Sequence, residues 1–317
     1  MAHGGKNRRE WLRDAGAVAA GIVAAGALPG AVASGQRLGN GDATPPSPAR
    51  DPESRGAVTE GARADRIRQS ASRWCYSRIP LPDLCKAGKE MGLSGIDLLQ
   101  EADWNVVIDH GLTVTMGYAA DRRDFLSNGF TNRASHPMLI KELERAIPIA
   151  AKKGVPNIIA MFGNRAGRTD VEAISAAVDG LRVIAPLAEK EGVTICVELL
   201  NSRVDHLGYH GDSTQFGVDV MKGVASSRVK LLYDIYHMQI MEGDVIRTIR
   251  RNKEWIGHYH TGGVPGRHEL DDTQELNWPA IVTAIADSGF TGYVAHEFVP
   301  TRDPLTSLRE AVRLCDI

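Results

Sequence analysis

The run VTICVELL at residues 193–200 decides the fold class. It is apolar almost without interruption, whereas a strand with one face in water would alternate apolar and polar residues. Such a run is typical of a parallel strand that is buried on both faces. Its charged exception is Glu198, a carboxylate close to the end of a buried strand, where a compensating charge is needed.

Similar β-rich runs recur along the chain and alternate with helical patterns. The eight expected strands are RWCYS (73–77), GIDLL (95–99), TVTMGYA (113–119), NIIAMFG (157–163), VTICVELL (193–200), VKLLYDIYH (229–237), IGHYHTG (256–262) and GYVAHEFV (292–299). Eight strand–helix units in about 250 residues predict an α/β chain folded as a (β/α)₈ TIM barrel, which we place at residues 64–317. A doubly wound open sheet is the alternative, but no GxGxxG or P-loop motif supports it.

The amino-terminal segment has the organisation of an export signal. Residues 6–33 begin with charges that include Arg8 and Arg9, continue with an Ala/Gly-rich apolar stretch and end with Ala-Val-Ala. The arginine pair resembles the twin-arginine signal. We therefore expect a signal peptide over residues 1–33, a disordered linker over 34–63, and export to the periplasm or extracellular space by the twin-arginine export machinery. An uncleaved segment that tethers the protein to the membrane is the alternative.

Charge and cysteine content exclude two classes of function. The formal net charge is −2, and no basic run follows the export signal, so a nucleic-acid partner is not expected. The four cysteines form no CxxC pair, which argues against a zinc knuckle or a thioredoxin-type site. The polar residues of the buried strands remain as the main source of chemistry.

Each of the last four expected strands carries a residue that can bind a metal. These residues are Glu198, Asp234, His260 and Glu297. They are separated by 36, 26 and 37 residues, which is about one strand–helix unit each time. Since the carboxyl ends of barrel strands form the active site of this fold, we expect the four side chains to lie side by side at the barrel mouth. His258 shares the strand face of His260 but lies deeper.

Three carboxylates and an imidazole are costly inside an apolar barrel unless a cation offsets their charge. Three oxygens and one nitrogen, with room for further ligands, suit one octahedral Mn²⁺, Mg²⁺ or Co²⁺ ion. Taken singly, each acid could instead pair with a loop arginine, and the histidine could be an ordinary hydrogen-bonded core residue. Four ligand types on four successive strands favour the metal site.

Four segments carry a resemblance to a known family. They are VELLN (197–201), LLYDIYHMQ (231–239), GHYHTGGVPGRHE (257–269) and AHEFVP (295–300). They resemble the xylose-isomerase-like TIM barrel superfamily, and within it the hydroxypyruvate isomerase branch, with the ketose 3-epimerases as close relatives. The resemblance covers roughly residues 70–317 and is specific from the fifth strand onward.

The resemblance implies roles for individual residues. It makes Glu198, Asp234, His260 and Glu297 the metal ligands, with the two glutamates as the paired acid and base. It makes His237 and Arg267 contacts of the substrate, and it implies a homo-oligomer. Two positions depart from the pattern. His260 stands where some hydroxypyruvate isomerases carry an amide. Val204 stands where the epimerases carry a glutamate, a role for which nearby His206 is the candidate.

The expected function is isomerisation of a small hydroxy-carbonyl substrate, a keto acid or a ketose, by proton transfer through an enediolate. Arg267 would favour a substrate carboxylate, unless it pairs on the surface with Glu269 or Asp271. A ketose 3-epimerase or keto-sugar lyase would use the same metal site. An endonuclease IV-like hydrolase needs more ligands than the first four strands offer, where Asp97 stands almost alone. A non-catalytic barrel is the remaining alternative.

Overall fold

The computed structural model describes residues 66–317. The expected signal peptide (1–33) and linker (34–63) lie outside the described residues. Within the described part of the chain, no helix is both long enough and apolar enough to cross a membrane.

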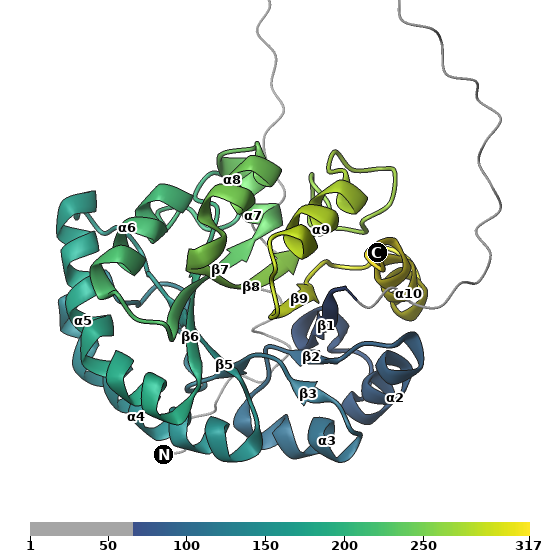
Figure 1. Ribbon diagram of the computed structural model, residues 1–317, viewed down its shortest axis with the longest axis horizontal. Coiled ribbons are helices and arrows are strands. Elements are labelled where there is room, and N and C mark those ends of the chain that lie inside the picture. Colours follow the sequence, from purple (N-terminus) through teal and green to yellow (C-terminus); the bar gives the residue numbers. More distant parts are fainter. Residues whose placement is uncertain (1–65) are drawn as a thin grey trace, which may run out of the picture. The chain divides into compact units, whose positions relative to one another are not determined.

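The described residues form alternating strands and helices (Figure 1). The strands are β1 (Arg68–Ser72), β2 (Gly95–Asp97), β3 (Thr113–Val114), β4 (Gly117–Tyr118), β5 (Asn157–Met161), β6 (Thr194–Leu199), β7 (Val229–Asp234), β8 (Ile256–Thr261) and β9 (Tyr293–His296). The α-helices are α2 (Leu81–Met91), α3 (Trp104–Asp109), α4 (His136–Lys153), α5 (Asp170–Glu191), α6 (Thr214–Val224), α7 (Ile235–Met241), α8 (Val245–Asn252), α9 (Trp278–Asp287) and α10 (Pro304–Leu314). Short 3₁₀ turns are η1 (Arg73–Tyr76), η2 (Glu101–Asp103), η3 (Arg133–Ser135) and η4 (Lys253–Trp255).

All ladders between these strands are parallel, in the order β3-β2-β1-β9-β8-β7-β6-β5-β4. β3 pairs with β2 and β4 pairs with β5, while a parallel bridge joins Leu99 to Gly117. Met116, between β3 and β4, accepts a hydrogen bond from the Leu99 N–H at 3.1 Å. The two short strands therefore fill one position of a closed ring, and the predicted (β/α)₈ barrel is confirmed.

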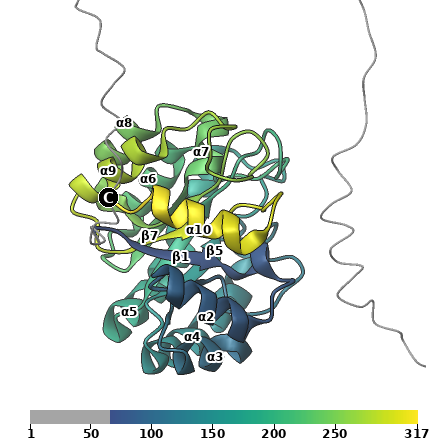
Figure 2. The same cartoon turned by 90° about the vertical axis from the view of Figure 1, so that its right-hand side faces the viewer.

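Helices surround the ring of strands, as Figure 1 shows along the barrel axis. Figure 2 shows α10 crossing in front of β1, where the Gln69 side chain donates to the Val312 carbonyl at 3.2 Å. β5 and β6 are buried at every position, which agrees with the unbroken apolar runs in the sequence. The apolar core therefore continues from the strands to the inner faces of the helices.

The first expected strand was wrong in position. Residues 73–76 form η1, and the strand is the preceding segment RQSAS, which pairs with β2 and β9. The aromatic residues and cysteine of RWCYS suggested a strand by propensity alone. In the structure the Arg73 guanidinium donates to the carbonyls of Tyr76 and Ile79, at 2.6 and 3.0 Å, and holds this segment in a turn.

Candidate metal centre and active site

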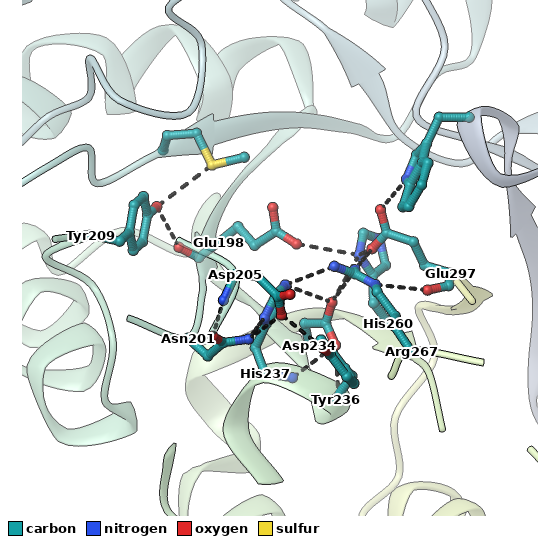
Figure 3. A network of polar contacts seen from close by, with 12 residues as sticks. Glu198, Asn201, Asp205, Tyr209, Asp234, Tyr236, His237, His260, Arg267 and Glu297 are labelled. Carbon is teal, nitrogen blue, oxygen red and sulfur yellow. Dashed lines mark hydrogen bonds and ion pairs between the residues drawn. The ribbon is translucent and has the colours of Figure 1, made fainter. Parts of the chain in front are cut away.

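Four buried side chains converge at the carboxyl ends of neighbouring strands (Figure 3). Glu198, Asp234 and His260 lie at the ends of β6, β7 and β8, and Glu297 directly follows β9. Each offers a ligand atom, and these atoms all lie within 4.8 Å of one another. Octahedral ligands at about 2.1 Å from an ion are roughly 3 to 4 Å apart. The predicted four residues are thus brought together at a spacing that fits one cation.

Asp234 has two tasks, one for each carboxylate oxygen. Its Oδ1 atom caps helix α7 by accepting the backbone N–H of Tyr236 at 2.9 Å, with His237 N at 3.4 Å. The expected strand 229–237 therefore ends at Asp234 and its last three residues are helical. The cap fixes the carboxylate and leaves Oδ2 facing the cluster.

His260 shows how the cluster would receive a cation. Its Nδ1 atom lies 2.5 Å from Glu297 Oε2, 3.4 Å from Glu198 Oε1 and 4.0 Å from Asp234 Oδ2. This nitrogen is buried but has no partner in hydrogen-bonding geometry. A buried polar atom without a partner is uncommon. Its position between three carboxylates is that of a ligand, so the residues present fit a divalent ion.

The charges of the site lead to the same conclusion. Three carboxylates converge, and the guanidinium of Arg267 offsets one of them. With a neutral imidazole, two negative charges remain, which is the charge that one divalent cation neutralises. Without that cation, the carboxylates favour protonation of the site: burial lowers the pKa of His260, but the charge of Glu297 and the neighbouring carboxylates raise it well above its usual value.

The two glutamates differ in their affinity for protons. Burial, together with the charges of Glu297 and Asp234, raises the pKa of Glu198 to about 7, against the opposing effect of His260. Burial also disfavours the charged form of Glu297, but Arg267 and His260 outweigh it and lower its pKa to about 2. Burial raises the pKa of Asp234 despite Arg267. Of the two glutamates, Glu198 is therefore the one that more readily carries a proton.

Arg267 points into the cluster. Its Nη2 atom lies 2.6 Å from both Asp234 Oδ2 and Glu297 Oε2. The backbone of Arg267 is left-handed, with φ of 58°, which typically costs about 1 kcal/mol or more in a residue other than glycine. Hydrogen bonds from Arg267 N to Gly263 O and from Val299 N to Arg267 O hold this conformation.

The alternative of a surface ion pair for Arg267 was wrong. Glu269 instead accepts hydrogen bonds from Thr301 and Ser307, and Asp271 pairs with Arg302 at 2.8 Å. These contacts fasten the loop that follows β8 to the segment that follows β9. The arginine is thereby left to the carboxylates of the site.

His237 and His206 lie beside the cluster. The Asn201 amide nitrogen lies 2.7 Å from His237 Nδ1 and holds the orientation of the ring. The Nε2 atom of this ring lies 2.9 Å from Arg267 Nη1 and 3.5 Å from Asp234 Oδ2. Burial and the Arg267 charge keep the pKa of His237 well below its usual value. The His206 ring packs edge-on against it, with 5.2 Å between centroids.

Three further residues of the site were not predicted. Trp74 donates its indole N–H to Glu297 Oε1, and Asn201 orients His237. Asp97 contacts the ring nitrogen of His260 that faces away from the three carboxylates, with Oδ2 3.0 Å from Nε2. Trp74 was hidden by the misplaced first strand. Asn201 belonged to the quoted VELLN segment, so its position was the available signal. His258 contacts Asp97 and not the three carboxylates, in agreement with its expected deeper position.

Curated relatives of this chain include isomerases and an epimerase. The putative hydroxypyruvate isomerase of Homo sapiens is 32% identical over 171 residues, covering 52% of this chain and 62% of that protein. The 2-oxo-tetronate isomerase of Cupriavidus necator is 34% identical over 157 residues, with coverages of 49% and 60%. The D-psicose 3-epimerase of Ruminiclostridium cellulolyticum is 36% identical over 125 residues, with 38% and 40%. The chain therefore spans less than two thirds of the length of each.

A solved structure and a family model give the wider relationship. The AP endonuclease of family 2 from Brucella melitensis has a TM-score of 0.66 and 24% identity, covering 76% of this chain and 96% of that one. At this identity the likeness shows the fold. The model of the xylose isomerase-like TIM barrel family matches residues 91–316, most of the chain. The chain belongs to the xylose isomerase-like TIM barrel family.

Proposed function

We propose that this protein is a divalent-metal-dependent isomerase of small hydroxy-carbonyl compounds. The observation that carries the proposal is the convergence of three buried carboxylates on His260 Nδ1, a buried nitrogen without a hydrogen-bond partner. Such a site is costly for a purely structural role, because burying like charges together destabilises the fold. The names of the curated relatives support the reaction class.

Glu198, Asp234, His260 and Glu297 would hold the cation, which we propose to be Mn²⁺, Mg²⁺ or Co²⁺. When bound, it would polarise the substrate oxygens and stabilise the negative charge that develops as a carbon-bound proton leaves. The protein residues must then bind the substrate, orient it and move the proton.

The two glutamates are suited to the proton transfer. They come from β6 and from the end of β9, with His260 between them, so they approach the mouth from different directions (Figure 3). One removes a proton from carbon and the other returns one, a contribution of about 10²- to 10⁴-fold in rate. Trp74 and Arg267 fix both oxygens of Glu297, whereas Glu198 Oε1 lies 3.4 Å from His260 Nδ1 and is held less closely.

A keto acid is the substrate class that Arg267 supports best. In the structure its Nη2 atom donates to Asp234 and Glu297, and a cation bound by these two carboxylates would free the guanidinium to pair with a substrate carboxylate. His237 and the nearby His206 would add contacts to substrate oxygens. Two curated relatives are named after reactions of keto acids, the putative hydroxypyruvate isomerase and the 2-oxo-tetronate isomerase.

A ketose epimerase is the second candidate. It is supported by the D-psicose 3-epimerase relative and by the presence of both glutamates, because removal and return of a proton at one carbon also needs two carboxylates. By contrast, the second possible ligand group of the described residues (Asp97, His258 and His260) shares His260 with the first. It gives no separate support to a hydrolase with several metal ions.

Product analysis tests the proposal. Metal-stripped full-length protein is supplied with Mn²⁺ or Mg²⁺ and incubated with hydroxypyruvate, 2-oxo-tetronate, free ketoses and 3-keto-glycosides, and the products are identified by ¹³C NMR. We expect a constitutional isomer of a keto acid, formed only with metal present. A ketose converted to its epimer would favour the second candidate, and no conversion of any compound by metal-loaded protein would refute both.

A further inference from the structure

A chain of polar side chains lies beneath the candidate metal centre. It runs from Ser70 on β1 through Thr115, between β3 and β4, to Asp97 on β2, and ends at His260 on β8. All four side chains are completely buried. Ser70, Asp97 and Thr115 belong to the first strands of the sequence, away from β6 and β7 in the strand order, and such buried polar groups need an explanation.

The hydrogen bonds that link these four side chains are specific. Thr115 Oγ1 donates to Asp97 Oδ1 at 2.5 Å, and Ser70 Oγ lies 3.1 Å from Thr115 Oγ1. His258 Nε2 lies 3.2 Å from the same Asp97 oxygen. The other oxygen, Oδ2, lies 3.0 Å from His260 Nε2. Asp97 is thus fixed on one side by Thr115 and directs its second oxygen at one nitrogen of His260.

This arrangement decides which nitrogen of His260 faces the cluster. An N–H on Nε2 that donates to Asp97 leaves the lone pair of Nδ1 directed to Glu198 and Glu297. A ligand imidazole must present a bare nitrogen to the cation, and a carboxylate behind it fixes both its tautomer and its ring orientation.

We propose that Asp97 is a positioning residue that holds His260 in the orientation needed to bind the cation. The inference rests on the proposed metal site and adds a residue from β2 to it. Asp97 itself touches neither the cation position nor the substrate, because His260 lies between them. Thr115 supports the same function one step further away.

A separate ion held by Asp97, His258 and His260 is the competing interpretation, since their ligand atoms also approach within 4.8 Å of one another. The hydrogen bond between His260 Nε2 and Asp97 Oδ2 satisfies that pair without an ion, whereas both ring nitrogens of His258 have no hydrogen-bond partner. The two interpretations differ in stoichiometry: positioning predicts one bound cation per chain and a separate ion predicts two.

The test is a Mn²⁺ titration of the metal-stripped full-length protein, followed by the EPR signal of free Mn²⁺. Loss of a carboxylate that orients a ligand histidine typically weakens metal affinity about 10- to 100-fold, and we expect this for Asp97→Ala. Asp97→Asn keeps an acceptor oxygen and should bind within about fivefold of wild type. Thr115→Val, a milder change, should weaken binding a few-fold.

A double-mutant cycle shows whether Asp97 acts through His260. In a His260→Gln background, Asp97→Ala should change the Mn²⁺ dissociation constant less than about twofold, because the residue that it positions is gone. Ser226→Ala is the matched control: Ser226 is a buried polar residue before the start of β7, and its hydroxyl donates to Glu189 Oε1 at 2.6 Å. It should leave Mn²⁺ affinity unchanged even if it lowers stability.

A second readout separates this inference from the metal site itself. The His260 Nε2–H resonance, assigned in ¹⁵N-labelled metal-free protein, should be visible in wild type and lost in Asp97→Ala. Wild type that shows this resonance but binds no Mn²⁺ would refute the metal site and leave the contact standing. Unchanged Mn²⁺ affinity in folded Asp97→Ala, an equal loss in the His260→Gln background, or two Mn²⁺ per chain would overturn the positioning role.

Discussion

Replacement of Glu198 by glutamine should make the metal-free protein more stable while it abolishes turnover. Glu198 is buried among like charges, and its pKa is raised from 4.5 to about 7. An unfolded chain therefore loses this proton at lower pH than the folded chain does. As a result, the free energy of unfolding falls between about pH 4.5 and pH 7 and remains low above pH 7.

The size of the effect follows from the same pKa values. A tenfold difference in proton affinity is worth about 1.4 kcal/mol, so the ionised carboxyl costs the folded state about 3 kcal/mol at pH 8. Glutamine has nearly the same shape and no charge. The Glu198→Gln variant should thus be more stable than wild type by up to about 3 kcal/mol at pH 8, or roughly 6 to 12 °C in Tm for a domain of this size. Near pH 4.5 the difference should nearly vanish.

Urea unfolding of the EDTA-treated proteins at a series of pH values measures this difference. Glu144→Gln, a change at an exposed glutamate of α4, is the control and should stay within about 0.5 kcal/mol of wild type at every pH. A Glu198→Gln variant that is less stable than wild type at pH 8, or a gain in unfolding free energy that does not depend on pH, would refute this reasoning. It would show that ionised Glu198 does not destabilise the folded protein. Saturating Mn²⁺ should reverse the order, because the cation stabilises wild type more.

Three other changes probe the site and the amino-terminal segment. Glu297→Gln should lower kcat about 10²- to 10⁴-fold while the circular dichroism spectrum remains that of the folded barrel, and turnover near wild type would remove Glu297 from the mechanism. Arg267→Ala should raise KM for a keto acid at least about tenfold more than KM for a neutral ketose, because only the keto acid has a carboxylate for the proposed pairing with the guanidinium. Equal increases would argue against a keto-acid substrate. Replacement of both Arg8 and Arg9 by lysine should retain the protein in the cytoplasm on cell fractionation, and unchanged export would exclude the twin-arginine route that we propose.

The late strands could be predicted because two independent signals coincide there. The runs around Glu198 and Asp234 are apolar enough to identify buried parallel strands, and each carries its ionisable residue near the carboxyl end. Barrel geometry then brings such residues together. For the same reason the sequence places Glu297, which directly follows β9, beside His260 of β8.

Contacts between distant segments could not be predicted. Asp97 and His260 are 163 residues apart, and no periodicity in either strand links them. The direction of Arg267 depends on a left-handed backbone and on the partners of Glu269, neither of which is visible in a loop sequence. RWCYS was misassigned because side-chain propensity favoured a strand, while pairing with β2 and β9 selected the preceding residues.

The central claim is that Glu198, Asp234, His260 and Glu297 hold a cation and use it to move a proton next to a carbonyl group. It is tested most directly by ¹H NMR of deuterium uptake from D₂O into hydroxypyruvate, 2-oxo-tetronate and a set of ketoses. Metal-stripped wild type should catalyse no exchange, added Mn²⁺ or Mg²⁺ should restore it for one substrate class, and Glu198→Gln or Glu297→Gln should abolish it. Metal-loaded protein that exchanges no proton in any of these compounds, or exchange that is equally fast without metal, would contradict the account.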